Sequence, residues 1–255
     1  MEVRILGSGT STGVPVIGCQ CQVCQSTDLK NKRTRSSIAF RKEGRPWMIV
    51  DTGPDFRAQV LQHDIRELEG VLYTHLHADH CHGFDDLRAF SFSRETPIPC
   101  YLLPHYIQEL KERFSYAFRE TGYRGAKPQV ALHPIPEEAF QFGPYEIDPV
   151  QLPHGPFITS GFRIGNFAYA TDFKHFTPEQ IQRWRGKITA MVASGIHFGM
   201  HPAHSVIPET VELFEKLEVK QGVITHISHM VDHERDSLKL PAHIKLAFDG
   251  MSIDV

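Results

Sequence analysis

The sequence predicts an α/β protein in which two β-sheets pack face to face and carry helices on their outer sides. Short apolar runs, rich in β-branched and aromatic residues, recur between turn signals, and their length favours strands. Amphipathic stretches with a proline at their start lie between some of these runs and favour helices. Because each half of the chain holds several adjacent strands as well as helices, we expect one covered sheet from each half.

The individual elements follow from these signals in chain order. Strands are predicted at 3–6, 37–40, 47–51, 70–74, 98–103, 162–165, 167–171, 189–194, 222–225, 244–248 and 252–255. Helices are predicted at 54–64, 104–118, 177–184 and 208–217. The aromatic and basic stretch from Arg113 to Gln129 is expected to be a surface loop, with an arch over a functional site as the alternative. No composition shift or flexible linker divides the halves, so we expect residues 1–255 to form one domain.

The composition narrows the class of protein and of partner. A hydrophobic fraction of 41% and a charged fraction of 22% describe an ordinary globular protein. The first residues show no export signal and no run is long enough to span a membrane, so we expect a cytoplasmic protein without a membrane partner. A formal net charge of -3 disfavours an extended nucleic-acid partner but permits a small anionic substrate.

The stretch LYTHLHADHCHG at 72–83 places four histidines and one aspartate within eight residues. Directly after the predicted strand GVLYT come His75, His77, Asp79 and His80. A loop that leaves a buried strand can hold such side chains inward on a rigid support, and alternation directs the first two to one point and the last two to another. One ion with an open position takes three protein ligands, so this loop predicts two ions that share a water.

Partners for this loop stand at the ends of later predicted strands. His154 follows VQLP, Asp172 follows FAYAT and His226 follows GVIT. Each of these residues alone is best interpreted as a surface or hydrogen-bonded residue. Together with the histidine-rich loop they become candidate metal ligands.

A second cluster of metal-binding residue types lies near the N-terminus. Cys19, Cys21 and Cys24 fall within six residues, and an odd total of five cysteines without an export signal indicates a metal rather than a disulfide framework. Three thiols are one ligand short of a closed zinc site, and His229 in THISH can complete it. This structural zinc would link the N-terminal loop to the loop of His226. A chance cluster of free thiols is the alternative.

The motif His-x-His-x-Asp-His with its three distant partners resembles the ligand set of the metallo-β-lactamase fold hydrolases, over essentially the whole chain. The resemblance implies a four-layer αββα sandwich. It also implies the ligand assignment: a first ion on His75, His77 and His154, a second on Asp79, His80 and His226, and Asp172 between the two. His82 has no place in this set and is expected on a helix surface.

The cysteine triplet, the THISH stretch and the closing FDGMSIDV resemble the PhnP-type phosphodiesterases, which act on ribosyl 1,2-cyclic phosphates. The triplet also resembles the B protein of pyrroloquinoline quinone synthesis, in which the catalytic ligand set is incomplete. The resemblance implies a small-molecule phosphodiester substrate, two active-site ions of manganese or zinc, and one structural zinc. It makes His204 the candidate general acid, with His197 and His201 as competitors, and Asp79 a second candidate catalytic residue.

Other activities of the same fold are alternatives. Small exonucleases of the tRNA-processing type, thioesterases and lactonases share the fold and the ligands, although no long arm for tRNA is evident and the last two lack a counterpart of His204. A metabolite carrier without enzymatic activity has to explain a complete two-ion ligand set. For the assembly, a homodimer is one expectation.

Overall fold

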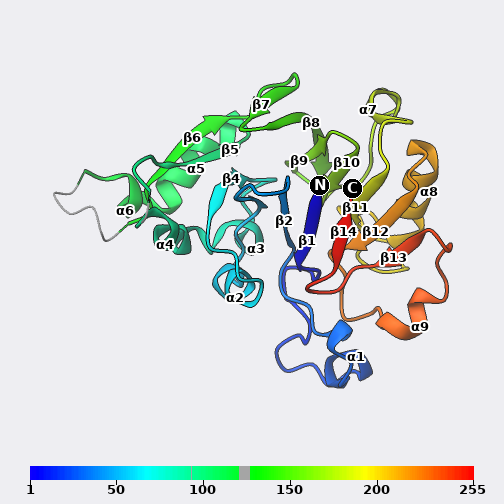
Figure 1. The fold of residues 1–255 in the computed structure, drawn as a ribbon. Coiled ribbons are helices and arrows are strands. Elements are labelled where there is room, and N and C mark those ends of the chain that lie inside the picture. The colour runs from blue at the N-terminus through cyan, green and yellow to red at the C-terminus, as the bar shows by residue number, and fades with distance from the viewer. Residues whose placement is uncertain (93, 121–126) are drawn as a thin grey trace.

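The structure is a computed structural model that describes residues 1–92, 94–120 and 127–255. Within these residues the strands form two seven-stranded sheets, and helices flank them on both sides (Figure 1). This architecture confirms the predicted αββα sandwich. One apolar core, with Phe40, Phe162 and Tyr169 among its residues, joins side chains of both sheets. A second core, with Trp184 and Phe214, packs the outer helices on the second sheet.

The first sheet has the strand order β14-β1-β2-β3-β4-β5-β6. Its strands are β1 (Glu2–Gly7), β2 (Ser37–Arg41), β3 (Trp47–Val50), β4 (Leu68–Leu72), β5 (Ile98–Leu102), β6 (Val130–Pro134) and β14 (Ser252–Asp254). Strands β3 to β6 are parallel, whereas β1, β2 and β14 pair antiparallel. The chain segments that follow β3 and β4 therefore leave the sheet at the same edge.

The second sheet has the order β13-β12-β11-β10-β9-β8-β7. Its strands are β7 (Phe140–Phe142), β8 (Tyr145–His154), β9 (Phe157–Ile164), β10 (Phe167–Ala170), β11 (Ala190–Ser194), β12 (Gln221–Thr225) and β13 (Ile244–Leu246). Strands β10 to β13 are parallel, and β9 runs antiparallel to both β8 and β10. The carboxyl ends of β8, β10 and β12 therefore point the same way.

The helices are short and lie outside the sheets. They are α1 (Gln22–Gln25), α2 (Phe56–Gln62), α3 (Ala78–Cys81), α4 (Leu87–Ser91), α5 (Pro104–Arg113), α6 (Ser115–Phe118), α7 (Pro178–Trp184), α8 (Ile207–Leu217) and α9 (His233–Ser237), with 3-10 turns η1 (Leu29–Asn31) and η2 (Phe84–Asp86). Thr177 and Gln180 form a capping box that begins α7, as the Thr-Pro start signal predicts. Across the part of the chain that is described, none of the helices combines the length and apolar character of a membrane span.

Two predictions of secondary structure need correction. The helix expected at 104–118 divides at Phe114 into α5 and α6. The strand list also omits β6, β7, most of β8 and the first five residues of β9. Prolines in the sequence of β8 argue against a strand, but Pro149 and Pro153 lie beyond the three residues of β8 that pair with β7, where one side of the strand needs no ladder donor. The stretch Arg113 to Gln129 falls partly outside the described residues.

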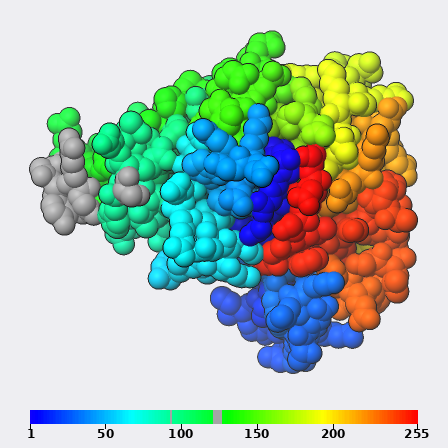
Figure 2. Space-filling view, in the orientation of Figure 1, coloured from blue at the N-terminus to red at the C-terminus, as the bar shows by residue number. Residues whose placement is uncertain are grey.

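The two ends of the chain and the cysteine-bearing segment lie together. Strand β1 pairs with β14, so the first and last strands are neighbours (Figure 1). In Figure 2 the blue N-terminal segment around α1 contacts the orange and red C-terminal part of the chain. Arg33, which is 2% exposed, donates to the carbonyls of Ser228 and Val231 at 3.0 Å. These bonds fasten the N-terminal segment to the loop that follows β12.

Candidate metal centre

The histidine-rich loop follows β4 directly and turns into α3. His75, Asp79 and His80 are buried, and His77 is half-buried. The ring of His75 lies 4.6 Å from that of His77 and 4.3 Å from that of His80, centroid to centroid. His82 is exposed just after α3, outside this group. The loop therefore presents the four predicted side chains together at the edge of the first sheet.

The distant partners come from the facing edge of the second sheet. His154 is the last residue of β8. Asp172 lies two positions beyond β10, and His226 lies one position beyond β12. All three residues are buried. Asp172 has a φ of 52° and His226 a φ of 56°, in the left-handed region that residues other than glycine rarely adopt. Such backbone conformations concentrate at functional sites, where the surrounding fold holds them in place.

The ligand atoms form two groups that share one aspartate. Within each group the ligand atoms lie within 4.8 Å of one another, and the groups are His75, His77, His154 and Asp172 on one side and Asp79, His80, Asp172 and His226 on the other. Asp172 Oδ2 is 3.8 Å from His75 Nε2 and 3.7 Å from His154 Nε2. Its Oδ1 is 3.0 Å from His226 Nε2. The structure thus brings together all seven residues in the two groups that the sequence predicts.

Hydrogen bonds on the outer side of the cluster fix how its histidines point. His80 Nδ1 donates to Asp51 Oδ2 over 2.7 Å. Thr74 Oγ1 donates to the same carboxylate at 2.8 Å, so its oxygen is left to accept from His75 Nδ1 at 3.0 Å. His154 Nδ1 donates to the carbonyl of Ala203 at 3.3 Å. In all three histidines the Nε2 lone pair therefore faces the cluster, as a metal ligand requires.

The cluster fits divalent cations by its donor set. Four inward-facing atoms are buried and have no hydrogen-bond partner among the described residues: His75 Nε2, Asp79 Oδ2, His80 Nε2 and His226 Nε2. Buried polar atoms are seldom left in this state, because each costs about 1–3 kcal/mol. Imidazole nitrogens and carboxylate oxygens in groups of four suit zinc, manganese and iron alike.

The electrostatics of the cluster agree with this fit. Burial lowers the pKa of His75 well below its ordinary value, so its imidazole is neutral and free to coordinate. Burial also opposes the charged form of His226, but the carboxylates of Asp172 and Asp79 raise its pKa to about 9. The carboxylates of Asp172 and Asp79 therefore favour positive charge at this place, which a bound cation would also supply.

Asp51 is a candidate functional residue that the sequence analysis does not identify. It follows β3, is fully buried, has a φ of 65°, and accepts bonds from Thr74 N at 2.8 Å as well as from His80 and the Thr74 hydroxyl. The signal was present, because Asp51 ends the predicted strand 47–51 in the way that Asp172 ends its own. Asp51 has no other metal-binding residue types at ligand spacing around it, so the sequence predicts it only as the last residue of a strand.

His204 lies against the cluster from the loop after β11. Its ring stacks on that of His226 at 5.2 Å and meets the ring of His154 edge-on at 4.7 Å. Its Nδ1 is buried and has no hydrogen-bond partner within the described ranges. Burial lowers the pKa of His204 to about 3. His201 is one ring further out, 4.7 Å from His204, and His197 lies beyond it at 6.0 Å from His201.

The three cysteines of the N-terminal segment converge on His229, which lies in the loop after β12. Its Nδ1 lies 3.3 Å from Cys19 Sγ, 3.5 Å from Cys21 Sγ and 3.6 Å from Cys24 Sγ. All three thiols are free of disulfides. The backbone N–H of Cys24 lowers the pKa of Cys21 to about 6, and burial raises that of Cys24 to about 11. Three thiols and one imidazole that converge on one point, with no disulfide among them, fit a closed tetrahedral zinc site.

Comparison with known proteins identifies the relatives of this chain. Residues 46–227 match the model of the beta-lactamase superfamily domain. A crystal structure of a diphosphatase from the PhnP family is 37% identical, with a TM-score of 0.91, and the match covers 99% of this chain and 96% of that one. Zinc-bound PqqB from Methylobacterium extorquens shares the fold at 19% identity, with a TM-score of 0.78 over the full length of both chains.

A curated relative from Porphyromonas gingivalis, named octanoyltransferase, is 33% identical over 98% of this chain. The match covers 51% of that protein, so this chain spans about half the length of the relative. The family model and the PhnP-family structure each cover most of the chain, and the TM-score of 0.91 shows that the fold is shared with that structure. The chain therefore belongs to the metallo-β-lactamase superfamily of hydrolases, and within it is PhnP-like.

Proposed function

We propose that this protein is a metal-dependent phosphodiesterase that hydrolyses a small or cyclic phosphodiester, such as a ribosyl 1,2-cyclic phosphate. The observation that carries the proposal is Asp172, whose two carboxylate oxygens reach both groups of ligands. Two cations held a few ångströms apart suit a phosphodiester, because they can contact both the attacking and the leaving oxygen. The PhnP-family diphosphatase at 37% identity supports a phosphorus-centred reaction.

In the proposal each residue of the cluster has a defined part. His75, His77 and His154 would hold one ion and Asp79, His80 and His226 the other, and Asp172 belongs to both groups. Such ions, of zinc or manganese, would supply a nucleophilic water and positive charge for the phosphate oxygens. Asp51 and Thr74 keep the ligand imidazoles in the orientation that the ions need.

His204 is proposed as the general acid for the leaving oxygen. The ring lies against His154 and His226, which belong to different ligand groups, so it stands beside both sites. Burial keeps this imidazole neutral, but the anionic phosphodiester beside the ring would raise the pKa of His204, so that the protonated ring can donate to the alkoxide that departs from the phosphorus. Asp79 is proposed to contribute to the same chemistry as a ligand of the second ion together with His80. The distance from Asp79 Oδ2 to His80 Nε2 is 3.1 Å. The further partners are proposed to be small molecules rather than membranes or long nucleic acids.

A diphosphate is the second candidate substrate. It is favoured by the name of the PhnP-family structure that covers 99% of this chain. The P–O–P bridge of a diphosphate is chemically a phosphoric anhydride, and its cleavage can use the same pair of cations. An acyl thioester is a more distant candidate, because the Porphyromonas gingivalis relative is named octanoyltransferase and the chain matches only about half of it.

A comparison of substrates tests the proposal. Manganese-loaded and zinc-loaded protein are each assayed with a ribosyl 1,2-cyclic phosphate, an aryl phosphodiester, a nucleoside diphosphate, an acyl thioester and a lactone. The proposal predicts that kcat/KM is highest for phosphodiesters. A preference for the diphosphate would support the second candidate, and a preference for the thioester or lactone would overturn the phosphodiesterase assignment.

A further inference from the structure

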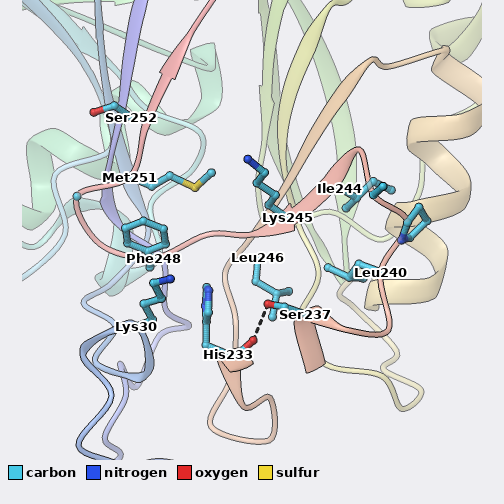
Figure 3. Close-up of a pocket in the computed structure, with 13 residues that line it drawn as sticks. Lys30, His233, Ser237, Leu240, Ile244, Lys245, Leu246, Phe248, Met251 and Ser252 are labelled. Carbon is cyan, nitrogen blue, oxygen red and sulfur yellow. Dashed lines mark hydrogen bonds between the residues drawn. The ribbon is translucent and has the colours of Figure 1, made fainter. Parts of the chain in front are cut away.

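A cavity of about 550 Å³ lies apart from the metal cluster, where the chain crosses from the second sheet to the first (Figure 3). Its walls come from η1, α9, β13 and the segment that leads into β14. None of the residues that line it is one of the candidate metal ligands. Its volume is within the range of cavities that hold small molecules.

The charged groups of the cavity have one sign. Lys30 and Lys245 both line it, and none of its described lining residues is acidic. Within the part of the chain that is described, neither lysine has a carboxylate within ion-pair distance. The nearby carboxylates have other partners: Asp28 accepts from the backbone N–H of Lys30, and Asp232 accepts from Asn31 and Arg235. Two unpaired cations that face one cavity attract an anion.

A buried histidine adds a second, independent feature. His233 is 8% exposed, and its side chain extends from α9 toward Lys30 and Phe248 inside the cavity (Figure 3). Its Nδ1 is buried and lacks a hydrogen-bond partner among the residues that the structure describes. A buried polar atom in this state indicates a missing partner, since its desolvation is otherwise uncompensated. His233 therefore offers a hydrogen bond to a group that enters beside the lysines.

The remaining wall of the cavity is apolar. Met251 and Leu246 are buried and line it together with Leu240. The Phe248 ring is already engaged, because Lys30 Nζ lies 5.1 Å from its centroid and His233 meets it edge-on at 5.8 Å. Lys30 and His233 therefore already contact this ring. The aliphatic side chains of Leu240, Leu246 and Met251 offer contacts to an aliphatic body.

We propose that this cavity binds a small organic anion with an aliphatic body, its phosphate or carboxylate group held by Lys30, Lys245 and His233. The body of the ligand contacts Leu240, Leu246 and Met251. The binding site is separate from the metal cluster and does not depend on the proposed hydrolytic activity.

Isothermal titration of the metal-loaded protein tests this site with three probes that share an eight-carbon chain: octanoate, octyl phosphate and uncharged octan-1-ol. We expect at least one anion to bind, with an affinity at least tenfold above that of the alcohol. Comparison of the two anions tells whether the head group is a carboxylate or a phosphate. A structure of the protein soaked in the tighter anion should show it between Lys30 and Lys245.

Variants locate the binding and separate it from the metal cluster. Lys30→Gln and Lys245→Gln should each weaken anion binding about tenfold and leave the turnover of the test phosphodiester unchanged. Lys187→Gln removes the same charge from an exposed position outside the cavity and should bind the anion like the parent. Absence of binding by both anions, or equal binding by the parent and both cavity variants, would overturn the proposal.

Discussion

The carboxylate of Asp51 accepts a hydrogen bond from His80 Nδ1 over 2.7 Å, although 29 positions separate the two residues in the chain. Asp51 follows β3 directly, and His80 lies in α3, which comes after the neighbouring strand β4. Because β3 and β4 are parallel, their carboxyl ends meet and the bond forms inside the sandwich. The strand order of the first sheet thus sets the orientation of a candidate metal ligand.

Asp51→Asn tests this link. The amide can no longer accept as a carboxylate from both His80 and Thr74, so His80 loses the partner that fixes its tautomer. We expect metal affinity and kcat/KM to fall about 10- to 100-fold. Metal content by elemental analysis and steady-state kinetics measure the two effects.

Asp249→Asn is the matched control, because Asp249 is half-buried and accepts bonds from Ser8 and Thr34 but belongs to neither group of ligands. It should lower stability and leave metal content intact. Parental metal affinity and turnover in Asp51→Asn would contradict the orienting function of this carboxylate.

The general acid predicts a dependence on the leaving group. His204→Ala should lower kcat about 100- to 1,000-fold for an alkyl phosphodiester, whose alkoxide needs a proton. For p-nitrophenyl phosphodiesters the loss should be under about tenfold, since that leaving group departs without help. His82→Ala, at an exposed position beside the same loop, should behave as the parent. An equal loss for both leaving groups would assign His204 to another task.

The cysteine cluster predicts a structural metal. Cys24→Ser should remove one equivalent of zinc and lower the free energy of unfolding by several kcal/mol, because a closed zinc site contributes directly to folding. The melting temperature should fall by about 10 °C. Cys100→Ala removes a buried thiol of β5 far from the cluster and should keep the full zinc content. Unchanged zinc content in Cys24→Ser would refute this site.

Asp236 predicts a pH-dependent contribution to stability. Burial opposes its charge, but bonds from Arg235, Lys239 and the N–H of Asp232 hold its pKa well below the ordinary value. A depressed pKa in the folded state stabilises the protein above the unfolded value of about 3.9 and loses that stabilisation as the pH falls further. Asp236→Asn should therefore cost about 1–3 kcal/mol at pH 7 and progressively less below pH 4.

Chemical unfolding of the parent and of Asp236→Asn at pH 7, 5, 4 and 3 measures this contribution as a difference between the two proteins. Asp232→Asn is not a suitable control, since Asp232 begins α9. Asp64→Asn is suitable, because that carboxylate is exposed and, among the described residues, forms an ion pair with Arg66 alone. A difference that stays constant from pH 7 to pH 3 would contradict the depressed pKa.

The sequence predicted the general architecture because local patterns encode it. The strands that precede His75, Asp172 and His226 are apolar runs bounded by turn signals. Such runs can be recognised in the sequence without tertiary information. Strand β8 cannot be predicted from such a pattern, because prolines argue against a strand. Pro149 and Pro153 are tolerated here because, among the described residues, that part of β8 pairs with β9 on one side and lies beyond the residues that pair with β7 on the other. Pairing of β14 with β1 depends on the final crossing between sheets.

The candidate site was predictable where residue type and spacing carry chemistry. Histidines and aspartates after successive strands indicate a metal cluster, and the structure brings them together. Asp51 was not predicted, because its function arises from the contact with His80 and not from a motif. The cavity of Lys30, Lys245 and His233 was not predicted either, since its three polar residues come from separate elements that only the fold brings close.

The most direct test of the account measures metal content and phosphodiester turnover on the same preparations of the parent and of His77→Ala. His77 is half-buried and belongs to one group of ligands, so its loss should leave the fold intact. The account predicts three equivalents of metal in the parent, fewer in the variant, and a loss of turnover that accompanies the loss of metal. Turnover that persists in His77→Ala after the metal is lost would contradict the proposed two-ion hydrolysis.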